Sequence, residues 1–426
     1  MADHADFVHG TDPRPSLLLL GFLALVALAT RSAAQGLPDP AESGIEHVVV
    51  VTMENRSFDH FLGWLPHADG RQEGLSFLDA DGRRHRTFRL APDYQGCSHP
   101  GPDHSYEGGR VEFNDGACDG WLRAGENDEF SIGFYKRNDL PFYAVAARQW
   151  TTCDRYFASI MAETWPNKIY QYAAQTDRLE NEFDLSTLPT IWDRLADANV
   201  SARYYFNDVP FVALWGVKYL PIARPFAQFL DDAEAGTLPA VAFIDPKFID
   251  EERGTSVDDH PRADVRDGQV FLEEIYRAVT TSPNWPGTVL VITYDEWGGF
   301  FDHVPPPLRP DLPPADEIAG NDGRLGFRVP CIVVSPFAAA RVSSVELEHC
   351  SVLRMIEWRW NLQPLTVRDA TANNLAEVLD FSLERLDAPQ IDVPAGPFGA
   401  ACPNVAGSDD KWDLLLLLAE LLGWPF

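Results

Sequence analysis

The sequence predicts an α/β fold with a mostly parallel central sheet sandwiched by helices. Several segments are continuous apolar runs rather than alternating ones, which is typical of strands buried on both faces of a parallel sheet. Helical patterns lie between these runs, and strands that alternate with helices indicate the α/β class. The length of 426 residues and the hydrophobic content of 45% are enough for one large domain with insertions.

The N-terminal segment is expected to be a targeting signal rather than part of the fold. Residues 17–30 (LLLLGFLALVALAT) form an apolar run that is short for a bilayer span. Ser32, Ala33 and Ala34 follow it as a small-residue cleavage pattern. Residues 1–34 are therefore predicted to be a signal peptide, and the protein to be secreted or periplasmic. An uncleaved anchor is the alternative.

The catalytic domain is expected over residues 45–400, and its strands can be placed in order. The expected strands are 45–53 (IEHVVVVTM), 202–206 (ARYYF), 240–244 (AVAFI), 288–294 (TVLVITY) and 329–334 (VPCIVV), all interpreted as parallel. A helix is expected at 269–279, where Phe271, Ile275 and Ala278 share one face, and Pro283 stops it.

Two further segments differ in composition from this core. Residues 66–130 are rich in Gly, Asp and Arg, and they are interpreted as a loop-rich insertion with a small hairpin or two. Residues 410–426 include WDLLLLLAELLGWPF, which predicts a short apolar helix. This helix either docks on the sheet or makes peripheral contact with a membrane.

Charge and cysteine usage restrict the partners and the compartment. The formal net charge is -30, which repels phosphate backbones and argues against nucleic-acid binding. The 6 cysteines are an even number in a chain expected to be exported, which favours disulfides. Cys97 and Cys118 flank a Gly/Asp/Pro-rich loop and are the expected pair. No CxxC spacing supports a zinc ribbon.

Oxygen-bearing side chains follow several of the predicted strands. Glu54 and Asn55 come after the first strand, Asn207 after the second, and Asp295 and Glu296 after the fourth. Ligands bind beyond the carboxyl ends of the strands of an open parallel sheet. Two adjacent carboxylates repel each other unless a cation lies between them. Carboxylate and amide oxygens favour one divalent ion, with Ca²⁺, Mg²⁺ or Mn²⁺ preferred over Zn²⁺.

Three histidines and one threonine complete the set of candidates. His104, His260 and His303 lie in loops rich in Asp, Gly and Pro, where a solvated histidine is the ordinary alternative to a functional one. Thr164 lies in MAETWPNK, just before an expected helix whose N-terminus favours a phosphate. Simple helix capping by Thr164 is the alternative.

Five segments, taken together, resemble the phosphoesterase family of bacterial and plant phospholipases C and bacterial acid phosphatases, within the alkaline-phosphatase-like superfamily. They run in order between about residues 45 and 380 and are ENRSFDHFLG (Glu54–Gly63), TWPNK (Thr164–Lys168), FNDVPF (Phe206–Phe211), DDHP (Asp258–Pro261) and TYDEWGGFFDHVPPP (Thr293–Pro307). The first and the last are each specific, and their occurrence in one chain makes chance a poor explanation.

The resemblance implies a role for each candidate residue. By position, Glu54, Asn55, Asp295 and Glu296 match metal ligands, and Thr164 matches the nucleophile that also contacts the metal. His104, Asn207, His260 and His303 match residues around the phosphoryl group. Lys168 departs from the arginine that is commoner at its position, and the surroundings of Thr164 are bulkier than usual.

The implied function is that of a secreted phospholipase C that releases diacylglycerol from a phospholipid through a phosphothreonine. A bound cation would activate the threonine hydroxyl. An acid phosphatase acting on soluble phosphomonoesters is the close alternative. A non-catalytic secreted binding module is a more distant one.

Overall fold

The computed structural model describes residues 36–309, 318–403 and 410–425. The predicted signal peptide at 1–34 lies outside the described residues. From Asp39 onward the described residues pack as one unit.

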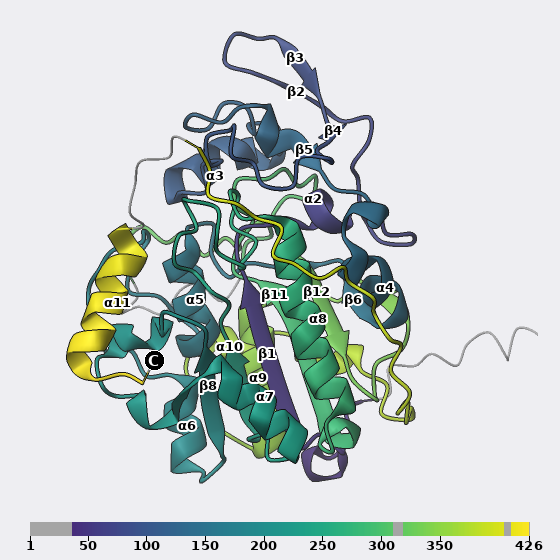
Figure 1. The fold of residues 1–426 in the computed structure, drawn as a ribbon, viewed down its shortest axis with the longest axis vertical. Coiled ribbons are helices and arrows are strands. Elements are labelled where there is room, and N and C mark those ends of the chain that lie inside the picture. The colour runs from purple at the N-terminus through teal and green to yellow at the C-terminus, as the bar shows by residue number, and fades with distance from the viewer. Residues whose placement is uncertain (1–35, 310–317, 404–409, 426) are drawn as a thin grey trace, which may run out of the picture. The chain divides into compact units, whose positions relative to one another are not determined.

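An eight-stranded sheet forms the centre of this unit (Figure 1). In spatial order its strands are β13 (Arg341–Ser343), β6 (Thr151–Cys153), β12 (Cys331–Val334), β11 (Thr288–Tyr294), β1 (His47–Met53), β10 (Val241–Ile244), β8 (Ala202–Phe206) and β9 (Ala223–Pro225). The expected class, a mostly parallel α/β sheet, is confirmed, since β11, β1, β10, β8 and β9 all pair in parallel. Every residue of β10 and β11 is buried, which explains why these segments are continuously apolar.

One strand direction differs from the prediction. β12 was expected to run parallel to its neighbours, but it is antiparallel to both β11 and β6. As far as it is described, the connection from β11 to β12 contains no helix. Without a crossover helix the chain returns from the carboxyl end of β11 in the opposite direction.

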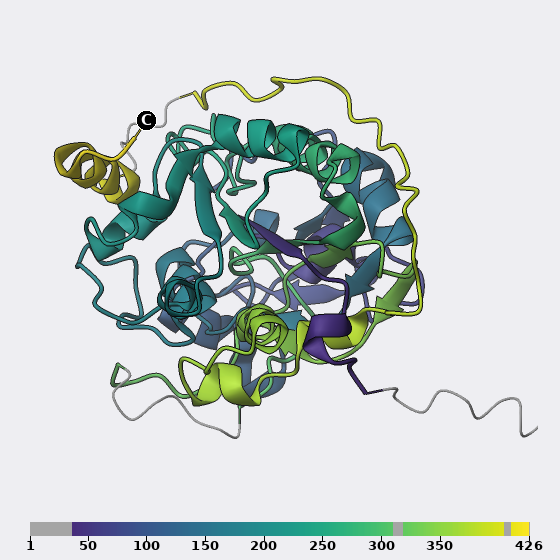
Figure 2. The same ribbon diagram turned by 90° about the horizontal axis from the view of Figure 1, so that it is seen from below.

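Helices cover both faces of the sheet (Figure 2). The described α-helices are α2 (Phe58–Leu62), α3 (Tyr106–Phe113), α4 (Pro141–Gln149), α5 (Thr164–Ala173), α6 (Ile191–Asp197), α7 (Phe226–Ala235), α8 (Val265–Thr281), α9 (His349–Trp360), α10 (Val367–Thr371) and α11 (Asp410–Leu422). Helices α4, α7 and α8 pack together on one face, and α5, α6, α9 and α10 on the other. In α8 the buried residues include Phe271 and Ile275, as expected, whereas Ala278 is only half-buried.

The insertion at 66–130 lies over the carboxyl ends of the central strands, at the top of Figure 1. It contains one antiparallel hairpin, β2 (Ser76–Leu78) with β3 (Arg84–Arg86), and β4 (Phe88–Arg89), which pairs with β5 (Gly133–Phe134). The remaining pair of short strands is β7 (Tyr156–Phe157) with β14 (Leu347–Glu348). The insertion thus covers the edge of the sheet at which β1 and β11 end.

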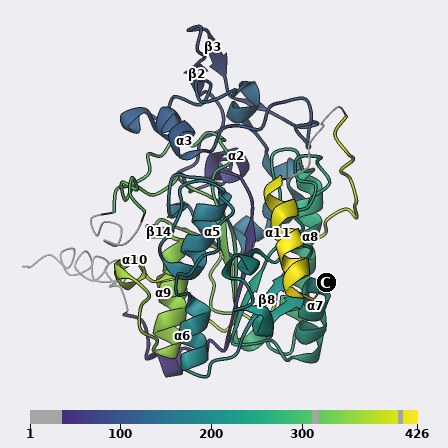
Figure 3. The same ribbon diagram turned by 90° about the vertical axis from the view of Figure 1, so that its left-hand side faces the viewer.

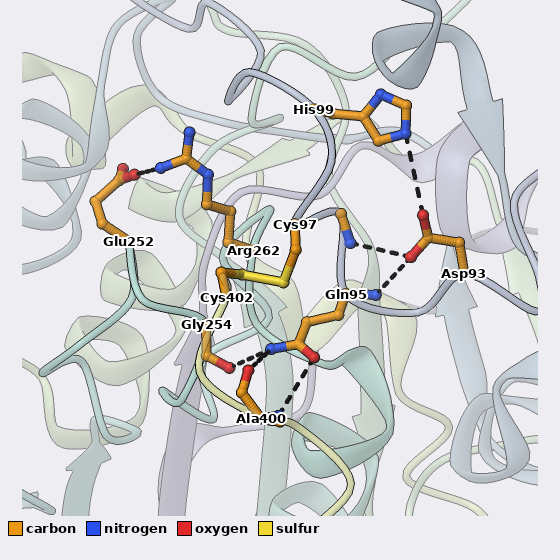
Figure 4. Close-up of a disulfide and its surroundings, with 10 residues drawn as sticks. Asp93, Gln95, Cys97, His99, Glu252, Gly254, Arg262, Ala400 and Cys402 are labelled. Atoms are coloured by element: carbon orange, nitrogen blue, oxygen red, sulfur yellow. Dashed lines mark hydrogen bonds and ion pairs between the residues drawn. A yellow bond between two sulfur atoms is a disulfide. The ribbon is translucent and has the colours of Figure 1, made fainter. Parts of the chain in front are cut away.

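The disulfide joins a different pair of cysteines from the one expected. Cys97 is bonded to Cys402 (Figure 4), whereas Cys118 is a free, buried thiol. Cys118 instead packs among apolar side chains that include Trp121 and Phe327. The pairing of Cys97 with Cys118 was therefore wrong, because spacing along the chain does not report which way an insertion turns its side chains.

The observed disulfide joins the C-terminal segment to the insertion, next to the loop that follows β10. Beside it, Gln95 donates to the carbonyl of Gly254, and Cys402 N donates to the carbonyl of Arg253 at 2.8 Å. Helix α11 then lies against the 3-10 helix η5 (Phe211–Trp215), and Figure 3 shows it in yellow on the outside of the fold. Among the described residues, none of the helices combines the length and the apolar content needed to cross a bilayer.

Candidate active site

The ends of β1 and β11 bring four of the predicted residues together. The strands pair in parallel with Met53 opposite Tyr294, and Asp295 N donates to the carbonyl of Met53 at 3.0 Å. The residues after each strand are consequently neighbours. Asn55 N donates to Asp295 Oδ1 at 3.1 Å, which joins the two chain segments directly.

The backbone around these residues is tightly constrained. Asn55 has a φ of 63°, in the left-handed region that asparagine tolerates better than most residues. Gly298 has a φ of 64°, and a Cβ at this position would lie 2.1 Å from the carbonyl oxygen of Asn55. Its N–H donates to Glu296 Oε2 at 2.6 Å. The glycine after the Asp295-Glu296 pair therefore allows the two strand ends to meet.

Thr164 approaches this edge from α5. Thr52 Oγ1 donates to Gln171 Oε1 at 3.1 Å, which fixes α5 against β1. One turn nearer the start of the helix, Lys168 Nζ donates to Asp245 Oδ1 at 3.2 Å. Burial alone would lower the pKa of Lys168, but Asp245 and Glu54 raise it above its ordinary value. The first turn of α5 therefore points towards the carboxyl ends of the strands.

Helix capping does not explain Thr164. The helix begins at Thr164 itself, with Glu163 as the N-cap residue. The hydroxyl is buried and has no hydrogen-bond partner among the residues that the structure describes. The next amide, that of Trp165, donates to Asn181 Oδ1 at 2.8 Å and is already satisfied within the protein.

Several buried oxygen atoms of the candidate site have no hydrogen-bond partner. Glu54, Asn55, Thr164, Asp295 and Glu296 are each 0% exposed. Each has at least one side-chain oxygen without a hydrogen-bond partner in the described part of the chain: Glu54 Oε1 and Oε2, Asn55 Oδ1, Thr164 Oγ1, Asp295 Oδ2 and Glu296 Oε1. Leaving such atoms buried and unpaired is costly. A divalent cation would satisfy them, and the donor set is the one that hard cations prefer.

The electrostatics agree with this interpretation. Burial, followed by repulsion from Glu251 and Asp295, raises the pKa of Glu54 well above its ordinary value. Burial and Asp295 do the same to Glu296. These carboxylates need a positive charge beside them if they are to be ionised together.

Two of the predicted histidines border the site. His104 Nε2 lies 3.2 Å from Asn55 Nδ2 and 3.9 Å from Glu296 Oε1, and its Nδ1 lies 2.8 Å from the carbonyl of Pro102. His260 is 4% exposed, and its Nδ1 has no partner among the described residues. Burial lowers the pKa of His260 well below its ordinary value, so its imidazole is neutral near pH 7.

The other two predicted residues around the phosphoryl group have different contacts. His303 Nδ1 lies 2.5 Å from Asp59 Oδ2, and its Nε2 lies 3.0 Å from Asp69 Oδ1. Asn207 is exposed and donates to the carbonyl of Asp245 at 2.8 Å. Direct contacts thus join His104 to the strand-end residues, whereas His303 is bound within a separate acidic cluster.

Two acidic residues that the sequence did not single out also belong to this region. Oxygen atoms of Glu54, Glu251 and Asp258 all lie within 4.8 Å of one another. Asp258 accepts from Ser256 Oγ and from His260 N through Oδ1, whereas its Oδ2 has no partner in the described structure. The tandem acids before His260 could have drawn attention to Asp258. Nothing local marks Glu251, which is placed by the fold of its loop.

Comparison with known proteins gives a consistent result. The sequence model of the Phosphoesterase family matches residues 45–363. Non-specific phospholipase C6 of Arabidopsis thaliana is 31% identical over an alignment of 461 residues. The alignment covers 97% of this chain and 88% of that protein. Phospholipase C B of Mycobacterium tuberculosis is 28% identical over 457 residues, which cover 87% and 86% of the two chains.

Solved structures with a similar arrangement are more distant in sequence. The phosphonate monoester hydrolase of Agrobacterium radiobacter has a TM-score of 0.40 and 10% identity, over 79% of this chain and 77% of that one. A protein in the alkaline phosphatase superfamily from Vibrio parahaemolyticus has a TM-score of 0.38 and 8% identity, over 77% and 69%.

Proposed function

Because the chain belongs to the Phosphoesterase family and is a hydrolase of phosphoric esters, we propose that it acts as a phospholipase C. The substrate would be a phospholipid, and the products diacylglycerol and the phosphorylated head group. The observation that carries the proposal is the set of buried, unpartnered oxygens at the ends of β1 and β11 and at the start of α5. Two of the relatives, one plant and one bacterial, are named phospholipase C, which supports the lipid substrate.

We assign the unpartnered oxygens to one divalent cation, with Ca²⁺, Mg²⁺ or Mn²⁺ favoured by the ligand chemistry. The protein ligands would be Glu54, Asn55, Thr164, Asp295 and Glu296. When bound, such an ion would lower the pKa of a hydroxyl and offset negative charge on phosphoryl oxygens.

The chain's own groups would perform the displacement. Thr164 Oγ1 would form a bond to phosphorus while the bond from phosphorus to the glycerol oxygen breaks, which leaves the head-group phosphate on the threonine. The proton of Thr164 would pass through a histidine to the departing diacylglycerol oxygen. Water would then attack the phosphothreonine and release the phosphorylated head group.

For this proton transfer His260 fits better than His303. It is buried and neutral near pH 7, and its Nδ1 is without a partner in the described structure, so it can accept a proton. Both ring nitrogens of His303 are already engaged by Asp59 and Asp69. His104, which lies beside Asn55, would orient a phosphoryl oxygen.

Helix α11 supports contact with a lipid surface. Leu414, Leu417 and Leu421 are 48%, 51% and 77% exposed, and their spacing places them along one side of the helix. The net charge of -30 disfavours anionic bilayers, so a zwitterionic surface is the expected partner. The buried Trp412 and Leu415 dock the opposite side on the fold.

Export to the periplasm or the medium is proposed together with this activity. The apolar run at 17–30 followed by small residues is the basis for it. The disulfide between Cys97 and Cys402 supports it, because such bonds persist in oxidising compartments.

Replacement of the nucleophile tests the proposal. Thr164→Ala is expected to abolish release of phosphocholine from phosphatidylcholine vesicles, and Thr164→Ser, which keeps the hydroxyl, is expected to retain part of it. Unchanged melting of both variants would show that folding is intact. Full turnover by Thr164→Ala would refute the assignment.

The choice of substrate separates the two candidate activities. Hydrolysis of a small aryl phosphate without hydrolysis of vesicle lipid would replace the phospholipase C assignment by that of an acid phosphatase. Hydrolysis of neither substrate, with the cation supplied, would favour a binding protein.

A further inference from the structure

The C-terminal helix delivers two adjacent side chains to the acidic loop of the site. Lys411 Nζ lies 2.6 Å from Glu251 Oε1, and Trp412 Nε1 donates to Glu251 Oε2 at 2.7 Å. Glu251 is 1% exposed, so these contacts are screened from water. Both carboxylate oxygens of Glu251 are therefore occupied by α11.

Trp412 fixes the position from which Lys411 reaches the loop. It is 0% exposed, and its ring stacks on Phe248 with a centroid separation of 4.3 Å and an interplanar angle of 5°. Its ring also lies 6.0 Å from that of Trp165, the residue after Thr164. The start of α11 thus lies against the first turn of α5.

Glu251 would otherwise be free to interact with a cation. Its carboxylate belongs to the group in which oxygens of Glu54, Glu251 and Asp258 lie within 4.8 Å of one another. Both oxygens of Glu54 and one of Asp258 lack partners among the described residues, whereas Glu251 has two. The difference between Glu251 and its two neighbours is the presence of Lys411 and Trp412.

We propose that Lys411 is a positioning residue that acts through Glu251. It neutralises this carboxylate and holds it away from the cation, and so it limits both the negative charge and the number of ligands around the ion. The proposal rests on the cation site of the proposed function and adds to it a residue outside the segment that matches the family, which ends at 363. Ligand charge is one of the quantities that set the affinity of carboxylate sites for divalent ions.

The binding of Mn²⁺ in the absence of substrate, measured by titration calorimetry, tests the proposal. Lys411→Met is expected to bind Mn²⁺ about tenfold more tightly than the unaltered protein, because Glu251 regains an unbalanced charge close to Glu54. Lys411→Arg keeps the charge and is expected to bind as the unaltered protein does. Loss of packing alone would weaken binding, so tighter binding is a response that a purely structural role would not give.

Two further variants identify the route of the effect. Lys218→Met is the matched control, because it removes an ammonium from an ion pair with Asp193, at 2.8 Å on the exposed surface, and should leave the Kd unchanged. The double variant Lys411→Met with Glu251→Gln removes both charges of the pair and should return the Kd to the original value. A double variant that binds as tightly as Lys411→Met would overturn action through Glu251.

The remaining outcomes are also decisive. A Kd for Lys411→Met within about twofold of the original would refute the proposal while the cation site itself stands. No Mn²⁺ binding by the unaltered protein would instead refute the cation site. Should Lys411→Met not fold, Lys411→Gln keeps a donor for Glu251, and the same tightening is expected of it.

Discussion

Two buried acidic clusters lie near the ends of the central strands, and they differ in how their oxygens are satisfied. In the cluster of Asp59 and Asp302, Arg328 uses every N–H of its guanidinium. Nε donates to Asp302 at 3.0 Å. One terminal nitrogen donates to both acids, at 3.1 Å to Asp302 and at 3.3 Å to Asp59. The other terminal nitrogen donates to two backbone carbonyls, each at 2.7 Å.

In the cluster of Glu54, Asp295 and Glu296 each carboxylate keeps an oxygen without a partner in the described structure. The first cluster is a completed ion-pair network, whereas in the described structure Lys168 and Lys411 act on the second only from a distance, without a direct ion pair. Proximity of carboxylates therefore does not identify a cation site, and their hydrogen bonds must be counted as well.

The largest expected change in the free energy of unfolding concerns the ion-pair network of Arg328, Asp59 and Asp302. Arg328→Met would leave Asp59 and Asp302 buried without their counter-charge, since all three side chains are 0% exposed. The free energy of unfolding is expected to fall by about 3–5 kcal/mol, measured by denaturant titration. The exposed Arg277→Met, which breaks a pair with Glu273, is the control and should change stability by less than about 1 kcal/mol. A loss that small for Arg328→Met would mean that the network is not the structural unit described here.

A somewhat smaller change in stability is expected when the cluster of Glu54, Asp295 and Glu296 is supplied with a divalent cation. Mn²⁺ or Ca²⁺ at about 100 times its Kd should stabilise the folded protein by about 2.7 kcal/mol, because the ion binds the folded state. Melting curves with and without a chelator measure this shift. Asp295→Asn should abolish it, whereas Asp302→Asn should leave it intact. Equal responses of the two variants would remove the distinction between the clusters.

The last effect, of similar size, concerns pH and belongs to the completed network. Burial raises the pKa of Asp302 to about 6, although Arg328 opposes the shift. In the unfolded chain this group ionises near pH 4, so between about pH 4 and 6 the folded state binds more protons than the unfolded state does. Its contribution to stability is therefore full below about pH 4 and is lost as the pH rises through about 6, by about 2.7 kcal/mol in total.

Denaturant titrations of the unaltered protein and of Asp302→Asn over this pH range measure the difference. The unaltered protein should lose stability relative to the variant as the pH rises, with or without a chelator. A difference that does not change with pH would show that Asp302 titrates at its ordinary pKa in the fold.

The strand-end residues could be found from the sequence because their positions follow from local patterns. β1 and β11 are recognisable apolar runs, and the carboxyl ends of neighbouring parallel strands meet at one edge. Glu54, Asn55, Asp295 and Glu296 follow directly from that rule. Thr164 could be placed at a helix start for a similar local reason, although only the structure shows that its hydroxyl is not used for capping.

The contacts that the sequence did not predict are those made across long connections. His303 follows Glu296 closely in sequence, yet the chain turns it towards Asp59. Glu251 and Lys411 are brought together over a separation that no local pattern reports. The partner of Cys97 is 305 residues away, at Cys402, for the same reason.

The amino-acid sequence alone determined the α/β class, five of the eight strands of the central sheet and the type of atom presented at their ends, since these depend on burial periodicity and on residues adjacent in the chain. The tertiary structure alone decided which carboxylates obtained a cationic partner, which way β12 runs and which residue covers Glu251. Those outcomes depend on side chains from distant segments that compete for the same buried oxygens, and only the folded chain decides which of them are close enough to pair.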